Sequence, residues 1–213
     1  MNISAIIVAA GSGKRFGSKK QYEYLGKKKI FEITLSKFLS VPNINNIILV
    51  LPKNDIEIIQ KKIKFNSCIK IIAGGKTRQH SVYNGLLSLA ENTDIVIIHD
   101  GVRPFVSKEI ILKSISETEK YGAAVVAVPV KDTVKIERKG FILKTPERKN
   151  IFLAQTPQTF KYSVIMQAYK KAFKNNFFST DDSALVEKLG KKVKVVLGDY
   201  KNIKITTRDD LSV

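Results

Sequence analysis

The chain has 213 residues, of which 44% are hydrophobic, and a formal net charge of +18. This length and composition suit one domain with a sizeable core, spanning residues 1–213. No apolar stretch approaches the roughly 20 residues that cross a bilayer, so we expect neither a membrane-spanning segment nor a membrane partner. The single cysteine, Cys68, cannot form an internal disulfide, which indicates a reducing compartment and a cytoplasmic location.

The positive charge comes mostly from lysine. The 37 basic residues comprise 31 lysines, which are scattered along the chain, and six arginines. Such a charge could attract nucleic acid or a phosphorylated substrate, or it could only keep the surface solvated. A nucleic-acid-binding protein would carry a basic face interleaved with aromatic side chains, and the sequence shows none, so we expect no nucleic-acid partner. The arginines are more informative, because their planar guanidinium binds phosphate oxygens in pairs.

In chain order, runs of apolar and often β-branched residues predict five buried strands of a parallel sheet, over residues 3–10, 45–52, 68–75, 94–101 and 123–130. Amphipathic segments between them predict helices over residues 30–39, 55–64, 81–90 and 108–122. Ser107 suits the N-cap of the last helix and Gly122 its end. Alternating strands and helices predict a doubly wound α/β sheet, whose ligands bind at the carboxyl ends of the strands.

Residues 131–152 interrupt this pattern. Apolar and polar residues alternate on both sides of the turn signal "ERKG", which predicts an inserted β-hairpin. The hairpin has no core of its own, so we expect it to protrude as a β-arm and to pack against a second copy of the chain. After it, the sequence predicts a helix over residues 162–173, a short helix after Thr180, and two further strands over residues 191–199 and 202–207.

The first strand leads into a glycine-rich loop, "AAGSGKRFGSKKQY", at residues 9–22. Gly11 and Gly13 allow a tight turn whose backbone N–H groups can point at phosphate oxygens. Phe16 stands where both the dinucleotide fingerprint and the Walker A motif require glycine, so neither motif is present. Arg15 and Lys20 add positive charge, and we therefore expect this loop to bind phosphate groups of another kind.

Seven segments in order along the chain carry a resemblance to a known family: "AAGSGKRFG", "AGGKTRQHSV", "HDGVRPF", "PVKDTVK", "AQTPQTF", "TDDSAL" and "NIKITT". They resemble 2-C-methyl-D-erythritol 4-phosphate cytidylyltransferases of the non-mevalonate isoprenoid pathway. The resemblance implies a Rossmann-like, mostly parallel sheet with a protruding β-arm that forms a homodimer. It also implies a reaction of CTP with a sugar-alcohol phosphate that releases pyrophosphate, with Mg²⁺ bound mainly through the CTP phosphates and no metal site made of protein ligands alone.

By the same resemblance, Arg15 and Lys20 stabilise the charge that develops at the transferred phosphoryl group. Lys19 is the alternative to Lys20, which we favour because it directly precedes "QY". The resemblance assigns nucleotide binding to Ala10, Gly11, Gly13, Gly75, Ser81 and Asp100. Asp100 either caps the turn after its strand or orients the ribose or the water shell of the magnesium ion, and the latter is our expectation.

The sugar phosphate is expected to be bound by two chains. The resemblance assigns Thr133 and the catalytic Arg148 to the arm of the partner, and Thr180 and the catalytic Lys204 to the chain that holds the nucleotide. Arg103 either binds the sugar phosphate or braces its own loop. A lysine inside the strand predicted at 202–207 would need an anionic partner, since an unpaired buried ammonium is costly.

Two other functions remain possible at this stage. A ribitol 5-phosphate cytidylyltransferase would share the fold and most loops, and "GVRPF" leans slightly toward it. The "AAG" of the first loop, "TDDSAL" and "PVKDTVK" favour the erythritol enzyme. A basic nucleic-acid-binding protein is the more remote alternative.

Overall fold

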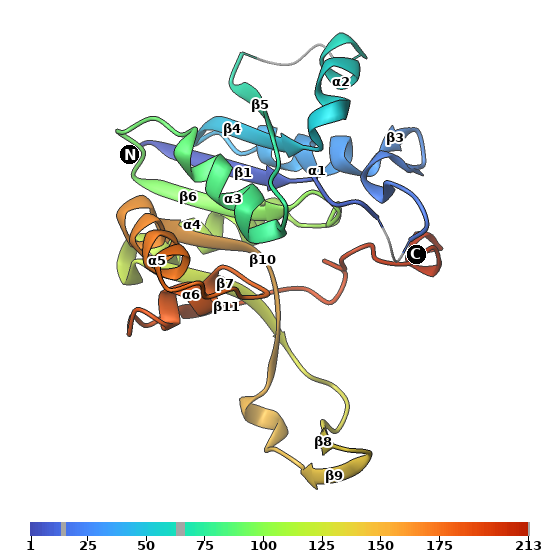
Figure 1. Ribbon diagram of the computed structural model, residues 1–213, viewed down its shortest axis with the longest axis vertical. Helices are drawn as coiled ribbons and strands as arrows, with labels where there is room; N and C mark the ends of the chain where they lie inside the picture. Colours follow the sequence, from blue (N-terminus) through green and yellow to red (C-terminus); the bar gives the residue numbers. More distant parts are fainter. Residues whose placement is uncertain (14–15, 63–66, 213) are drawn as a thin grey trace.

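The computed structural model describes residues 1–13, 16–62 and 67–212, and its centre is a seven-stranded sheet (Figure 1). The strand order is β11-β7-β10-β6-β1-β4-β5. β10 runs antiparallel to both of its neighbours, and all other neighbouring strands are parallel. The strands are β1 (Ile3–Val8), β4 (Ile44–Leu51), β5 (Ile69–Ala73), β6 (Ile95–Asp100), β7 (Ala123–Pro129), β10 (Phe152–Lys161) and β11 (Lys194–Leu197).

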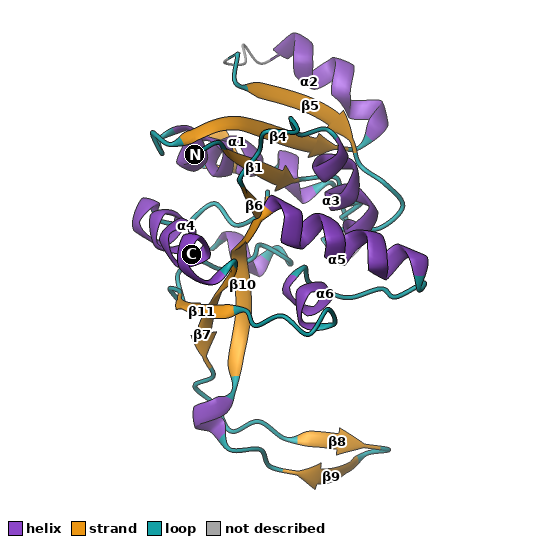
Figure 2. Ribbon diagram, turned by 90° about the vertical axis from the view of Figure 1, so that its left-hand side faces the viewer, coloured by secondary structure: helices purple, strands orange, loops and turns teal. Residues whose placement is uncertain are grey.

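Helices cover both faces of the sheet, which makes a three-layer molecule (Figure 2). On one face lie α1 (Ile30–Leu39), α2 (Ile56–Lys62) and α4 (Lys108–Tyr121), and on the other α3 (Arg78–Leu87), α5 (Tyr162–Lys174) and α6 (Ser183–Glu187). Successive side chains of a strand point to opposite faces, so Ala5 and Ile7 join the core under the first group of helices and Ile6 joins the core under the second. Both cores form because the central strands are apolar throughout.

The predicted fold class is confirmed. The five predicted strands and the helices predicted between them are present, with ends that differ by a few residues. The predicted caps of α4 are also confirmed: the Ser107 hydroxyl accepts a hydrogen bond from the backbone N–H of Ile110, and Gly122 adopts the left-handed conformation, with φ of 86°.

One predicted strand is absent, and one strand of the structure was not predicted. Residues 202–207 form no strand and instead follow β11 as an irregular segment, in which the backbone N–H of Ile205 donates to the carbonyl of Val102 after β6. β10 was not predicted at all, because Pro157 and the polar run around it are unfavourable for a central strand. The structure accommodates them through a break in register between Ala154 and Gln158, so the proline occupies a place where the pairing with β7 is already interrupted.

The chain leaves β1 toward β4 and β5 on one side, and later returns to β6 on the other side of β1. This reversal makes the carboxyl ends of β1 and β6 the topological switch point, where open α/β sheets bind ligands. The loop after β1 and the end of β6 at Asp100 meet there.

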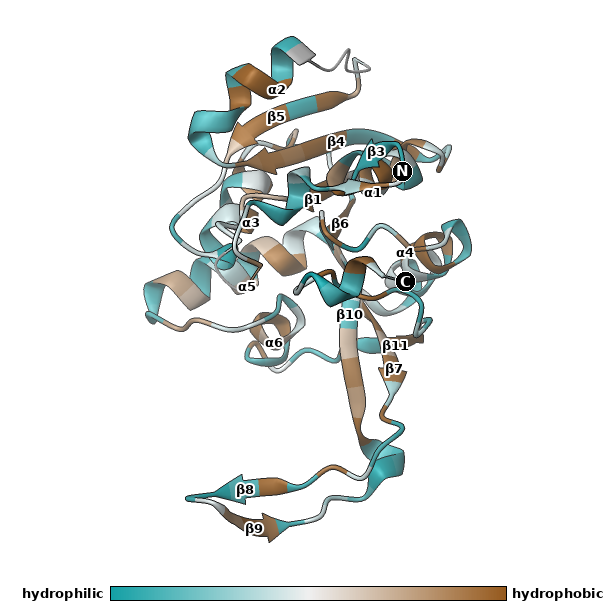
Figure 3. Cartoon of the chain, turned by 90° about the vertical axis from the view of Figure 1, so that its right-hand side faces the viewer, coloured by the Kyte–Doolittle hydropathy of each residue, from teal (hydrophilic) through white to brown (hydrophobic). Residues whose placement is uncertain are grey.

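The predicted β-arm projects from the body of the molecule, with β8 (Ile136–Arg138) and β9 (Phe141–Lys144) at its tip (Figures 1 and 3). Smaller elements complete the fold: β2 (Tyr24–Leu25), β3 (Lys28–Lys29) and the 3-10 helices η1 (Lys20–Tyr22), η2 (Lys53–Asp55), η3 (Arg148–Asn150) and η4 (Asp209–Leu211). In the part of the chain that the structure describes, no helix has both the length and the apolar character needed to cross a membrane.

Candidate active site

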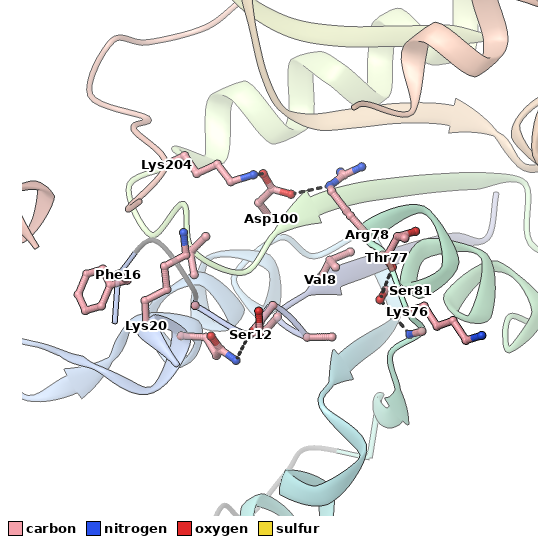
Figure 4. A pocket seen from close by; sticks show the side chains of 17 residues that line it. Val8, Ser12, Phe16, Lys20, Lys76, Thr77, Arg78, Ser81, Asp100 and Lys204 are labelled. Atoms are coloured by element: carbon pink, nitrogen blue, oxygen red, sulfur yellow. Dashed lines mark hydrogen bonds and ion pairs between the residues drawn. The ribbon is translucent and has the colours of Figure 1, made fainter. Parts of the chain in front are cut away.

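A cavity of about 530 Å³ opens at the switch point, a size typical of small-molecule sites (Figure 4). Its walls come from four parts of the chain: the loop after β1, the start of α3, the carboxyl end of β6, and the segment after β11. The described lining residues are Val8, Ala9, Ala10, Gly11, Ser12, Gly13, Phe16, Lys20, Gln21, Gly75, Lys76, Thr77, Arg78, Ser81, Asp100, Val102 and Lys204.

The glycine loop has a conformation that requires glycine at one position. Gly13 has φ of +73°, and a Cβ atom there would collide with the backbone carbonyl of Ser18. The side-chain amide of Gln21 donates a hydrogen bond to the carbonyl of Gly11 over 3.0 Å, which ties the loop to η1. The described part of the loop before Gly13 therefore lies along the cavity wall and is tied at Gly11 to η1.

The neighbours of Lys20 are fixed by Asp55. The ammonium of Lys19 lies 2.7 and 2.8 Å from the two carboxylate oxygens of Asp55, and the hydroxyl of Tyr22 donates to the same carboxylate over 2.8 Å. Lys20 lines the cavity, on a different wall from Lys204 (Figure 4). Of the two adjacent lysines, Lys20 is the one among the described lining residues of the cavity.

The loop between β5 and α3 forms the adjoining wall. The hydroxyl of Ser81 accepts a hydrogen bond from the N–H of Gly75 over 3.0 Å and donates one to the carbonyl of Thr77 over 2.9 Å. A Cβ atom on Gly74 would collide with Ala10 and press on Ser81. The close approach that Gly74 permits therefore packs this loop directly against the loop after β1.

Asp100 lies at the centre of the charges. Its carboxylate binds Arg78 Nε over 3.0 Å and Lys204 Nζ over 2.8 Å, and Arg103 Nε lies 3.8 Å away. Burial alone would raise the pKa of this carboxyl group, but the three surrounding cations hold the pKa well below its usual value. Asp100 is therefore ionised at any physiological pH.

Arg78 connects two buried carboxylates. Besides Asp100, its guanidinium binds Asp182 over 2.8 Å, and the hydroxyl of Tyr169 donates a short hydrogen bond to that second carboxylate. The backbone N–H of Asp182 is held in turn by the side-chain carbonyl of Gln158. These contacts join the start of α3 to the segment just before α6, 104 residues later in the chain.

Thr156 and His99 support Asp100 from behind. The Thr156 hydroxyl accepts a hydrogen bond from the backbone N–H of Asp100 over 3.1 Å and lies 3.0 Å from Nδ1 of His99. Nε2 of His99 lies 3.2 Å from the carbonyl of Arg103. Burial lowers the pKa of His99 to about 4, so the ring is neutral near pH 7.

Comparison with known proteins shows which family the chain belongs to. The family model for 2-C-methyl-D-erythritol 4-phosphate cytidylyltransferase matches residues 3–213. The chain belongs to this family. A relative of that name from Clostridioides difficile is 48% identical over 215 residues, which cover 99% of this chain and 91% of that protein. Membership of this family disfavours the nucleic-acid-binding alternative.

Solved structures of family members share the fold. The crystal structure of 4-diphosphocytidyl-2C-methyl-D-erythritol synthase from Anaerococcus prevotii aligns with a TM-score of 0.90 at 42% identity, covering 99% of this chain and 95% of that chain. A 2-C-methyl-D-erythritol 4-phosphate cytidylyltransferase from Francisella tularensis aligns with a TM-score of 0.86 at 35% identity, covering 100% and 97% of the two chains.

The cavity brings together most residues that the sequence assigned to this cytidylyltransferase site. Eight of them line it: Ala10, Gly11, Gly13, Lys20, Gly75, Ser81, Asp100 and Lys204. Arg103 stands behind the wall, in contact with Asp100. Thr180 is exposed, and Thr133 and Arg148 lie on the arm of the same chain, away from the cavity lining. Arg15 lies outside the described residues.

Arg78, Asp182 and Gln21 were not among the site residues predicted from the sequence. Arg78 lies in the segment "AGGKTRQHSV" and Asp182 in "TDDSAL", and the only available signal was a charged side chain beside small and polar residues. Lys204 was predicted to lie inside a strand and to need an anionic partner. In the structure it lies in an extended segment, and Asp100 of the same chain supplies the carboxylate.

The described residues offer little direct ligation for a metal ion. They contain no group of three or more His, Cys, Asp or Glu side chains that could hold one. Asp100 is the one carboxylate among the described lining residues, and both of its oxygens already bind cations. This donor set is compatible with a Mg²⁺ ion that would take phosphate oxygens and water as its ligands.

The buried neutral His99 predicts a specific dependence of stability on pH. Its pKa is about 4 in the folded chain and near 6.5 when unfolded, so between these values the unfolded state binds more protons. The free energy of unfolding should therefore fall by roughly 3 kcal/mol as the pH drops from about 6.5 to about 4. Urea unfolding at several pH values would measure this slope.

The two histidines of the chain provide a matched control. His99→Gln should remove most of that slope, whereas His80→Gln, on the half-exposed face of α3, should retain it. If the unfolding free energy of His99→Gln still fell with pH as steeply as that of the wild type, His99 would not be the cause of the pH dependence.

Proposed function

We propose that the protein transfers the cytidylyl group of CTP to 2-C-methyl-D-erythritol 4-phosphate, giving 4-diphosphocytidyl-2-C-methyl-D-erythritol and pyrophosphate. The observation that carries this proposal is a switch-point cavity that joins a glycine loop to Lys20 and Lys204 in a chain of the cytidylyltransferase family. Both substrates are anionic, and the cavity offers backbone amides and cations to anions.

In this reaction a phosphate oxygen of the sugar phosphate forms a bond to the α-phosphorus of CTP. The bond from that phosphorus to the oxygen bridging toward the β-phosphate breaks, and pyrophosphate leaves with the electron pair. Lys20, and Arg15 by the resemblance, would stabilise the charge that builds on the phosphoryl oxygens. Lys204 would hold the incoming phosphate in line, and Gly75 and Ser81 would contact the base or ribose.

We propose that Mg²⁺ accompanies the nucleotide. When bound, it would neutralise charge on the phosphate oxygens. Asp100 would orient its water shell or the ribose, while the loop of Ala10, Gly11 and Gly13 would direct its N–H groups at the triphosphate. The location that fits this activity is the cytoplasm, which agrees with a chain that holds a single cysteine.

Turnover of the two candidate acceptors tests the proposed activity. With CTP, the protein should convert 2-C-methyl-D-erythritol 4-phosphate far faster than D-ribitol 5-phosphate, as measured by pyrophosphate release. UTP in place of CTP should support little turnover, because the loop at Gly75 and Ser81 is expected to select cytosine. A preference for ribitol phosphate would replace the proposed substrate while leaving the fold and the reaction class intact.

The working form is proposed to be a homodimer built by the arm. Phe141, Ile142 and Leu143 on β9 are 80%, 63% and 63% exposed, so the apolar strand that Figure 3 colours brown at the tip of the arm is largely open to solvent in the single chain. Such a patch favours a protein partner. At the base of the arm, the Arg148 guanidinium donates to the carbonyl of Lys131 over 2.7 Å, which ties the two sides of the arm together.

In this dimer the arm of one chain would bring Thr133 and Arg148 to the cavity of its partner, where Thr180 and Lys204 would complete the binding of the sugar phosphate.

Mixing two inactive variants tests whether the two chains share one site. Arg148→Ala and Lys20→Ala chains should each be nearly inactive alone, but an equal mixture should recover about a quarter of wild-type activity. Half of the dimers are then mixed, and one of the two sites in each is intact.

Arg138→Ala is the matched control on the same arm. Arg138 lies exposed on β8, so this variant should keep full activity. Native mass spectrometry, which resolves the small mass difference between the two variants, would verify the exchange of subunits. Absence of recovery after verified exchange would contradict the shared site.

The adjacent lysines test the assignment of Lys20. Lys20→Ala should lower kcat by about a hundred- to a thousandfold with a much smaller change in KM for CTP, because the ammonium acts mainly on the transition state. Lys19→Ala should change kcat little, since its half-exposed ion pair with Asp55 contributes at most about 1 kcal/mol. Steady-state kinetics would show the reverse order if Lys19 were the catalytic group.

A further inference from the structure

Two cations compete for one oxygen of Asp100. Lys204 Nζ lies 2.8 Å from Oδ2 of Asp100, and Arg103 Nε lies 3.8 Å from the same oxygen. Arg103 Nε is buried and has no hydrogen-bond partner among the described residues. Buried N–H groups of proteins nearly always donate a hydrogen bond. The Nε–H of Arg103 is slightly too far from its nearest acceptor, Oδ2 of Asp100, which already binds Lys204.

The two cations differ in their freedom to move. Arg103 is 11% exposed in its side chain, and its Nη1 donates a hydrogen bond to the carbonyl of Asn202 over 2.7 Å. Lys204 is 36% exposed, lines the cavity, and lies in the extended segment after β11. Lysine has a flexible stem and a rotatable ammonium. Of the pair, Lys204 can turn into the cavity, and Arg103 Nε can then donate a hydrogen bond to Oδ2 of Asp100.

We infer that Asp100 is the centre of a counter-ion exchange: it holds Lys204 through Oδ2 before substrate binds, and it accepts a hydrogen bond from Arg103 Nε once an anionic substrate draws Lys204 into the cavity. The inference rests on the proposed function for the identity of that anion, a sugar phosphate. Arg103 is then a positioning residue, which acts through Asp100 and Lys204 and makes no contact with the reacting atoms.

This exchange solves an electrostatic problem of the site. If Lys204 left Asp100 without a replacement, the bare Oδ2 would repel the arriving phosphate. Arg78 stays on the other oxygen, Oδ1, where its second contact with Asp182 anchors it. With Arg103 on Oδ2, the carboxylate keeps a partner on each oxygen, and the full charge of Lys204 becomes available to the substrate.

The side-chain N–H signals of arginine allow a direct test, because the chain contains six arginines. In ¹⁵N NMR spectra of the full chain, loss of a signal in Arg103→Lys would assign the Nε–H of Arg103. In Lys204→Met without any ligand, this signal should move downfield and its exchange with water should slow, since Arg103 can take Oδ2. Lys204→Gln repeats the test should the first variant fold poorly.

Lys201→Met is the matched control, because it removes the same charge from the same segment at an exposed position and should leave the Arg103 signal unchanged. Adding 2-C-methyl-D-erythritol 4-phosphate to the wild-type protein should produce the shift seen in Lys204→Met.

An unchanged Arg103 signal in both Lys204 variants would overturn the exchange, even if the protein turns over its proposed substrate. A shift in the variants with none on adding the sugar phosphate would overturn the role of the substrate as its trigger. The ligand-free variants thus test the exchange independently of the proposed function, which the turnover measurement tests by itself.

Discussion

The buried carboxylate of Asp100 is the charge on which the arrangement of this site depends. It faces Arg78 from α3, Arg103 from the loop after β6 and Lys204 from the segment after β11. Without a carboxylate between them, three cations would repel one another in a poorly solvated region. Because each cation comes from a different part of the chain, one residue at the end of β6 fixes three walls of the cavity relative to each other.

The sheet was largely predictable, because β-branched apolar runs and periodic helices are local signals. β10 was missed because its sequence violates the local preferences of a central strand. The reason becomes visible in the tertiary structure: the interrupted register frees Thr156 to bind the backbone N–H of Asp100 and to contact His99. The polar residues that make β10 a poor strand candidate thus support the site. Their role in the site explains why the sequence lacks the apolar pattern by which a central strand is usually recognised.

The site was predictable where its geometry is local. The glycine loop was identified from spacing, and the left-handed Gly13 explains why that spacing is needed. The pairing of Arg78 with Asp182 spans 104 residues, and that of Lys204 with Asp100 a similar distance, so neither partner can be found from one sequence alone. The prediction that Lys204 needs an anionic partner agrees with its ion pair to Asp100, but the predicted strand around it is wrong.

The segment after β11 therefore belongs to the site although it adds no strand to the sheet. Asn202 is fully buried, and its side chain donates to the carbonyl of Thr156 over 2.9 Å, while its own carbonyl accepts from Arg103. The residue that anchors this segment thus contacts both the support behind Asp100 and the cation beside it. Lys204 follows two residues later and extends back to the carboxylate, so the extended segment takes its position from the same charge that it helps to neutralise.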